Sequence, residues 1–279
     1  MATRSYRDAP TRWIDVGGTR FSYRRLGPSA TPPVIFLNHL SAVLDNWDPR
    51  VVDGIAATRD VIVFNNRGVG SSEGRTPRSV EEMATDAVAF IRALGLSQVD
   101  LLGFSLGGFV SQVLARRAPD LIRKVVLAGT GPAGGVGIDE VTPITVLDMI
   151  RGGLTRRDPK HYLFFTSTAN GQAAARSFLQ RLHERTEDRD APVSITAFRN
   201  QLAAIRRWGK QEPWDLSTIQ HPVFVANGEH DRMVPTSNTT ALARRLPNAT
   251  VSIYPDAGHG GIFQHHDRFV REVLEFLGP

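Results

Sequence analysis

The sequence predicts an α/β fold in which a mostly parallel β-sheet is covered by helices on both faces. Short apolar segments of strand length alternate with longer segments of helical periodicity, and turn residues separate them. Strands joined through helices in this way lie parallel in one sheet. The length of 279 residues and the hydrophobic content of 41% allow one large domain, or two small ones, with a sizeable core.

The first half of the chain carries the clearest alternation. Gly17-Gly18 lies between two strand-like segments, 13–16 and 21–26, which predicts a β-hairpin. Ser79 with Glu82 three residues later is typical of the capped start of a helix. The other elements expected in this half are strands at 34–37, 61–64, 99–104 and 125–128, and helices at 79–94 and 106–117.

The alternation is interrupted after Gly129. Residues 130–137 have the composition of a loop, and from about 138 to 210 the pattern is helical only. Beyond Trp214 the alternation resumes, with strands expected at 223–226 and 251–254 and helices at 239–246 and 269–277. We therefore expect an α/β core made of residues 1–131 and 215–279, interrupted by a helical cap insertion at 132–214.

Composition excludes several classes of protein. The chain has no cysteine, so disulfides, thiolate nucleophiles and cysteine-ligated metals are excluded. Its longest apolar runs, such as 61–64, are far shorter than a membrane span, and residues 1–8 lack the apolar segment of a signal peptide. We expect a cytoplasmic protein with no membrane partner.

The net charge of +5 raises the question of nucleic-acid binding, since 30 of the 33 cations are arginine. A nucleic-acid surface would show a basic run or stripe with interleaved aromatic residues. The closest groupings here are pairs, such as Arg116-Arg117 and Arg206-Arg207, among acidic residues or apolar helix positions. We therefore expect solvated helix faces and surface ion pairs, and no nucleic-acid partner.

A Gly-x-Ser-x-Gly motif, Gly103-Phe104-Ser105-Leu106-Gly107, lies between a predicted strand and a predicted helix. In a nucleophile elbow the serine occupies a strained turn, and the glycines let strand and helix approach closely. The backbone N–H of Leu106 would then point from a helix N-terminus toward a developing oxyanion. Because the chain has no thiol, we expect Ser105 to be the nucleophile. The alternative is a turn whose glycines serve packing alone.

A serine nucleophile needs a base, and the base needs an orienting acid. Asp231 follows one late predicted strand, with Glu229 as a rival acid nearer the strand, and His259 follows the next strand. Because the carboxyl ends of parallel strands meet at one edge of the sheet, we expect Ser105, Asp231 and His259 to form a catalytic triad. Taken singly, Asp231 could cap a helix and His259 could be an ordinary loop histidine.

These segments resemble the α/β-hydrolase superfamily with a helical cap, over nearly the whole chain. Within it the sequence is most similar to enol-lactone hydrolases, carboxylesterases and cofactor-free perhydrolases. The resemblance implies the α/β-hydrolase fold, a mostly parallel twisted sheet with helices on both faces and an inserted helical cap. It rests on the segments Gly18–Tyr23, Asn65–Ser72, Gly103–Gly108, Gly228–Pro235 and Gly258–Gly260.

The sequence departs from the superfamily pattern at two places. Where many members have an aspartate before Arg-Gly-x-Gly-x-Ser, this chain has Asn65, which puts the local ion pairing in doubt but not the chemistry. The loop 38–41 reads Asn-His-Leu-Ser, closer to the Asn-Ser-Leu-Gly of the enol-lactone hydrolases than to the common His-Gly-x. By this alignment the backbone N–H groups of Leu40 and Leu106 form the oxyanion hole, and a shift of one residue would place Ser41 there instead.

Other residues of interest have weaker interpretations. His39 could line the pocket or simply pack. His265-His266-Asp267 lacks a metal-binding spacing such as His-Glu-x-x-His, so we expect a solvated helix start, with no metal and no cofactor. Aromatic residues that could line a pocket or fill protein cores are Trp47, Phe164, Phe165, Phe178, Phe198, Trp208 and Trp214.

Together the residues and the resemblance predict a serine hydrolase that cleaves a small-molecule ester or lactone through an acyl-enzyme. A perhydrolase or a C–C bond hydrolase would use the same triad. A non-catalytic small-molecule receptor is the alternative from another class, although such receptors typically lose triad residues. Ser105 argues against haloalkane dehalogenases and epoxide hydrolases, which use an aspartate at the elbow. The oligomeric state is open, with a homodimer as one option.

Overall fold

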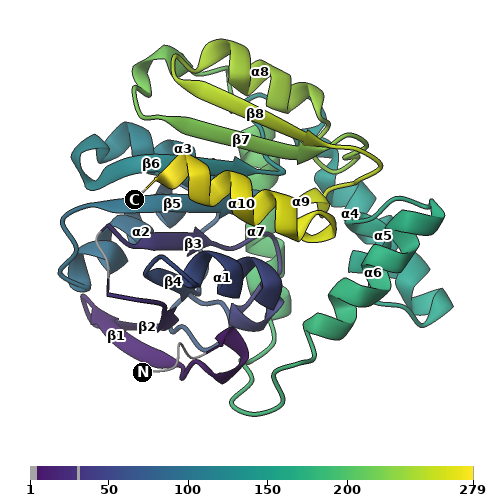
Figure 1. Ribbon diagram of the computed structural model, residues 1–279, viewed down its shortest axis with the longest axis horizontal. Coiled ribbons are helices and arrows are strands. Elements are labelled where there is room, and N and C mark those ends of the chain that lie inside the picture. The colour runs from purple at the N-terminus through teal and green to yellow at the C-terminus, as the bar shows by residue number, and fades with distance from the viewer. Residues whose placement is uncertain (1–4, 30–31, 279) are drawn as a thin grey trace.

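The computed structural model describes residues 5–29 and 32–278, and within them one eight-stranded sheet forms the centre of the molecule (Figure 1). The strand order is β1-β2-β4-β3-β5-β6-β7-β8. β2 is antiparallel to both of its neighbours, and all other pairs are parallel. The strands are β1 (Arg12–Val16), β2 (Thr19–Leu26), β3 (Val34–Leu37), β4 (Val61–Phe64), β5 (Val99–Phe104), β6 (Ile122–Ala128), β7 (Val223–Gly228) and β8 (Ala249–Tyr254).

Burial along the strands explains their sequence patterns. The inner strands β3, β4, β5 and β7 are buried at every position, as expected for short apolar runs covered on both faces. The edge strands β1 and β8 carry exposed and half-buried residues. The predicted α/β fold with a mostly parallel sheet is confirmed, and the predicted strand ends differ by up to three residues.

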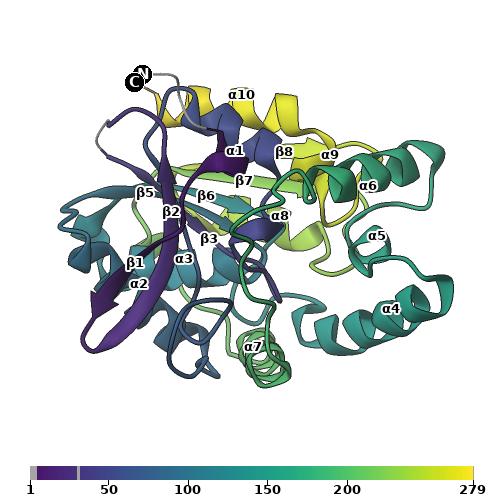
Figure 2. The same ribbon diagram turned by 90° about the horizontal axis from the view of Figure 1, so that it is seen from below.

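Helices cover both faces of this sheet. Figure 2 shows α1 and α10 on one face, and α2 and α3 on the other. Ser79 begins α2 as predicted, since its hydroxyl accepts from the backbone N–H of Glu82 and donates to the Glu82 carboxylate. α1 was not expected from the sequence, because eight residues give too short a sample of helical periodicity. The core helices are α1 (Pro49–Ala56), α2 (Val80–Ala93), α3 (Leu106–Arg117), α8 (Ser237–Arg245), α9 (Gly261–Gln264) and α10 (His266–Leu277).

The segment between β6 and β7 is described without gaps and contains helices but no strand, in agreement with its helical pattern. In Figure 1, α4 to α6 lie beyond the carboxyl ends of β7 and β8. α7 returns to the sheet side, where Trp208 stacks on Phe109 of α3 with ring centroids 5.5 Å apart. That residues 132–214 form a separate cap remains a prediction. Its helices are α4 (Val141–Thr155), α5 (Lys160–Leu163), α6 (Ala169–Arg181) and α7 (Ile195–Gly209).

Among the described residues, no helix combines the length and the apolar character that crossing a membrane requires.

Candidate active site

Ser105 lies at the turn between β5 and α3 in a strained backbone conformation, with φ 55° and ψ −116°. Its backbone N–H donates to the Ala128 carbonyl at 2.9 Å, which ties the turn to β6. The glycines on either side are required sterically. A Cβ on Gly103 would lie 2.3 Å from Ser111 Oγ, and one on Gly107 would lie 2.0 Å from the Leu37 carbonyl oxygen. The turn therefore has the geometry expected of a nucleophile elbow.

His259 and Asp231 form a buried hydrogen-bonded pair at the carboxyl ends of β8 and β7. His259 Nδ1 lies 2.7 Å from Asp231 Oδ2, and the two side chains are 1% and 0% exposed. The other carboxylate oxygen of Asp231 accepts from the backbone N–H groups of Met233 and Val234, at 2.8 and 3.0 Å. These bonds fix the carboxylate, and Nδ1 of the ring donates to it. His259 Nε2 is then the nitrogen free to act as a base.

The rival acid, Glu229, lies elsewhere. Its side chain is half exposed, stands 3.6 Å from His230 Nε2, and accepts from the backbone N–H of Asp256 at 3.3 Å. Of the two acids that the sequence offered, the structure brings Asp231 to the histidine.

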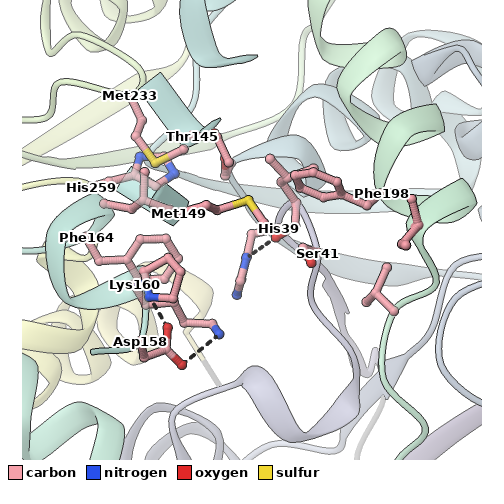
Figure 3. A pocket seen from close by; sticks show the side chains of 16 residues that line it. His39, Ser41, Thr145, Met149, Asp158, Lys160, Phe164, Phe198, Met233 and His259 are labelled. Atoms are coloured by element: carbon pink, nitrogen blue, oxygen red, sulfur yellow. Dashed lines mark hydrogen bonds and ion pairs between the residues drawn. The ribbon is translucent and has the colours of Figure 1, made fainter. Parts of the chain in front are cut away.

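A cavity of about 300 Å³ contains both Ser105 and His259 in its wall (Figure 3). Of the aromatic candidates, Phe164 and Phe198 line this cavity, whereas Phe178 stacks on Phe263 with centroids 4.8 Å apart. Lys160 also lines it, and no sequence pattern marked that residue. Most of the apolar wall comes from the segment between β6 and β7, through Met149, Leu163, Phe164, Val193, Ile195 and Phe198.

The loop after β3 contributes Leu40 and Ser41 to the same cavity. The Ser41 backbone N–H donates to Gln201 Oε1 of α7 at 2.8 Å, so this amide is already engaged. Of the two residues that the sequence suggested as oxyanion donors beside Leu106, Ser41 therefore has its backbone N–H occupied, and the assignment to Leu40 stays a prediction. Trp47 is buried below the loop, where its Nε1 donates to Asn38 Oδ1 at 2.7 Å. Trp47 therefore packs against the loop and holds it, and it does not line the cavity that contains Ser105.

His39 both lines the cavity and packs. Its ring lies edge-on to Phe104 and Phe164, with centroids 5.3 and 5.2 Å away. Nδ1 stands 2.8 Å from the Leu40 carbonyl oxygen, which accepts a hydrogen bond and so requires the proton on Nδ1. Burial, followed by the positive charge of Lys160, lowers the pKa of His39 to about 3. The ring is therefore neutral at physiological pH.

Asn65 stands where the superfamily pattern has an acid, and the carboxylate of another residue, Asp190, lies against it. The Asn65 side-chain amide donates to the Asp190 carboxylate, which lies on the loop between α6 and α7. Asp190 also accepts from the backbone N–H and the hydroxyl of Ser71, at 2.8 and 2.7 Å. In the same turn, Arg67 pairs with Asp86 of α2. The turn is thus held by one ion pair and several hydrogen bonds despite the missing aspartate.

The chain belongs to the alpha/beta hydrolase fold family, because the family model of that description matches residues 32–266. The fold, the elbow and the acid–histidine pair agree with this membership. The chain is similar to a solved alpha/beta hydrolase fold protein from Chitinophaga pinensis, with 41% identity and a TM-score of 0.94 over 98% of this chain and 99% of that one.

Two curated relatives are enzymes with different named activities. A non-heme chloroperoxidase from Streptomyces lividans is 28% identical, over 93% of this chain and 96% of the relative. A 2-hydroxymuconate semialdehyde hydrolase from Pseudomonas putida is also 28% identical, over 79% of this chain and 77% of the relative.

Proposed function

We propose that this protein is a serine hydrolase that cleaves carboxylic esters or lactones through an acyl-enzyme intermediate. The observation that carries the proposal is the 2.7 Å hydrogen bond between His259 Nδ1 and Asp231. His259 and Ser105 also line the same cavity. A neutral imidazole held this way presents Nε2 as a general base to a serine hydroxyl.

The proposed reaction has two halves. Ser105 Oγ attacks the carbonyl carbon while His259 Nε2 takes the hydroxyl proton, and Asp231 stabilises the imidazolium. The tetrahedral oxyanion accepts hydrogen bonds from the Leu40 and Leu106 backbone N–H groups, each of which contributes roughly 3–4 kcal/mol. The intermediate collapses, and the alkoxide leaves with the proton from His259. Water then attacks the acyl-enzyme in the same way and releases the acid and the free serine.

Fluorophosphonate labelling tests this assignment, because such probes phosphonylate an activated serine. We expect labelling of the native chain, none of Ser105→Ala, and retained labelling of Ser41→Ala, which lacks the other serine hydroxyl of the cavity wall. Full esterase activity in Ser105→Ala would overturn the proposal.

A perhydrolase is the second candidate, favoured by the similarity to the non-heme chloroperoxidase. In that reaction a carboxylic acid would acylate Ser105 with release of one water molecule, and hydrogen peroxide would then take the acyl group, which gives a peroxy acid and the free serine. Peroxide-dependent halogenation in acetate buffer, compared with hydrolysis of aryl esters and homoserine lactones by the same preparation, separates the two. A C–C bond hydrolase on the same triad is tested by adding a ring-cleavage dienoate to this panel.

A non-catalytic receptor would behave differently from all of these enzymes, since its ligand would raise the melting temperature without forming product.

We further propose that residues 132–214 act as a cap that sets substrate choice, in line with their share of the cavity wall. A small-molecule substrate, the absence of nucleic-acid and membrane partners, and a cytoplasmic location remain predictions.

A further inference from the structure

His39 Nε2 is a buried polar atom without a hydrogen-bond partner among the described residues. The side chain is 3% exposed and belongs to the wall of the cavity that contains Ser105. Nδ1 carries the proton, because it faces the Leu40 carbonyl oxygen. Nε2 of the neutral ring therefore presents a lone pair, and leaving a buried acceptor unpaired lowers the stability of the protein. A group that donates a hydrogen bond to this atom would recover that loss.

Lys160 supplies a donor to the same region of the cavity. It begins α5, and its backbone N–H donates to Asp158 Oδ1 at 2.8 Å, which fixes the start of that short helix. Its ammonium group forms an ion pair with Asp158 Oδ2 at 3.6 Å, a distance too long for a hydrogen bond, so its N–H groups can still donate to a ligand. In Figure 3 the ends of Lys160 and of the His39 ring point toward one another. The positive charge of Lys160 is also one of the causes that lower the pKa of His39, after burial.

We propose that His39 Nε2 and Lys160 Nζ form a subsite for a hydroxyl group, so that the preferred ester or lactone carries a hydroxyl close to its scissile carbonyl. A hydroxyl satisfies both atoms at once, because it donates to Nε2 and accepts from the ammonium group. A carboxylate would be attracted by Lys160 but would place its own lone pairs against Nε2. An apolar chain would leave His39 Nε2 unpaired and would leave Lys160 with its ion pair to Asp158 alone.

The hydroxyl belongs close to the reacting carbonyl because of the order of residues in the loop. His39 immediately precedes Leu40, the proposed oxyanion donor, and both line the cavity. The subsite therefore adjoins the position of the carbonyl oxygen. This inference rests on hydrolysis at Ser105, and it names the substrate class that the same site would prefer.

Three matched aryl esters test the preference: 4-nitrophenyl 3-hydroxybutyrate in both enantiomers, 4-nitrophenyl butyrate, and the 4-nitrophenyl monoester of succinate. We expect kcat/KM for one hydroxybutyrate enantiomer to exceed that for butyrate at least about tenfold. The succinate monoester should gain no such advantage. Equal values for hydroxybutyrate and butyrate, or a preference for succinate, would overturn the proposal.

Substitutions locate the preference in the two residues. His39→Leu and Lys160→Met should each lower the hydroxybutyrate-to-butyrate ratio at least about threefold, since each removes one of the two hydrogen bonds, and the double variant should bring the ratio to about one. His39→Gln keeps a side-chain acceptor and should restore part of the ratio. Thr145→Val is the matched control, because it removes another polar group of the same cavity wall. A ratio that persists in His39→Leu, or disappears in Thr145→Val, would contradict the assignment.

A binding readout separates failure of this inference from failure of the proposed function. In Ser105→Ala with ¹⁵N-labelled histidine, the His39 Nε2 resonance is assigned by its absence from the Ser105→Ala/His39→Leu double variant. Methyl 3-hydroxybutyrate should move this resonance toward the hydrogen-bonded range, and methyl butyrate at the same concentration should not. Equal effects, or none, would overturn the subsite even if the esters are hydrolysed. A selective shift would support the subsite even if no ester is turned over.

Discussion

The imidazole of His259 and the carboxylate of Asp231 are joined by a 2.7 Å hydrogen bond and are almost completely shielded from solvent. In Asp231→Asn the side-chain amide would donate to Nδ1, so that Nε2 would carry the proton and lose its function as a base. We expect kcat for an aryl ester to fall about 10⁴-fold while the fold is kept. Steady-state kinetics together with circular dichroism check both parts.

Glu229→Gln is the matched control for this variant, because Glu229 is half exposed and lies beside His230. Its kcat should stay within about twofold of the native value, as is usual for a solvent-exposed substitution. A large loss in Glu229→Gln with little change in Asp231→Asn would reassign the acid.

Gln201 of α7 holds the proposed oxyanion loop through the Ser41 backbone N–H. Gln201→Leu removes the acceptor and loosens the loop, so kcat should fall about tenfold with little change in KM. Asn200→Leu is the neighbouring control, since it loses a 2.8 Å bond to the Thr76 carbonyl instead. Both variants should lower the midpoint of urea unfolding, but only Gln201→Leu should lower kcat. Equal kcat values for Gln201→Leu and Asn200→Leu would show that the bond from α7 does not position the oxyanion loop.

Asn65 and Asp190 form an amide–carboxylate pair, and exchanging the two residue types tests whether the pair stabilises the fold. Asn65→Asp places a second carboxylate against Asp190, which should cost about 2–3 kcal/mol of unfolding free energy. The double variant Asn65→Asp/Asp190→Asn restores one acid and one amide, and should recover most of that loss. Urea titration of the four proteins gives the coupling energy. Additive losses would show that the two side chains do not act as a pair.

Because the pKa of His39 is lowered to about 3, the free energy of unfolding should depend on pH. Between this value and the unfolded value near 6.5, the unfolded chain binds the proton and the folded chain does not, so stability rises with pH in that window. The contribution is complete above about pH 6.5 and is lost progressively as the pH falls. From pH 7 to pH 5 the native chain should lose about 2 kcal/mol more than His39→Gln, measured by urea unfolding. Identical losses would mean that His39 titrates normally.

Much of the site followed from the order of elements along the chain. Ser105, Asp231 and His259 each follow a predicted strand, and parallel strands bring their carboxyl ends to one edge, so their meeting could be expected without knowing any distance. The sequence favoured Asp231 as the acid but could not exclude Glu229, because both lie in the same loop two residues apart. The backbone N–H groups of Met233 and Val234, which hold Asp231, become visible only in the folded loop.

Contacts made by the segment between β6 and β7 could not be predicted. Asp190 bonds to Ser71 across 119 residues of sequence, and Gln201 bonds to Ser41 across 160. Lys160 lines the cavity itself. Helical periodicity shows which face of a helix is apolar, but not which distant loop that helix meets. The acceptor that engages the Ser41 backbone N–H therefore had no signal in the sequence.

The most direct test of the account is to trap the acyl-enzyme by rapid acid quench during turnover of an aryl ester, followed by intact-mass spectrometry and peptide mapping. We predict that the protein gains the mass of one acyl group, located on Ser105, and that Ser105→Ala gains none and turns over no ester. Hydrolysis that proceeds with no acyl group on Ser105, or that survives in Ser105→Ala, would contradict the central claim.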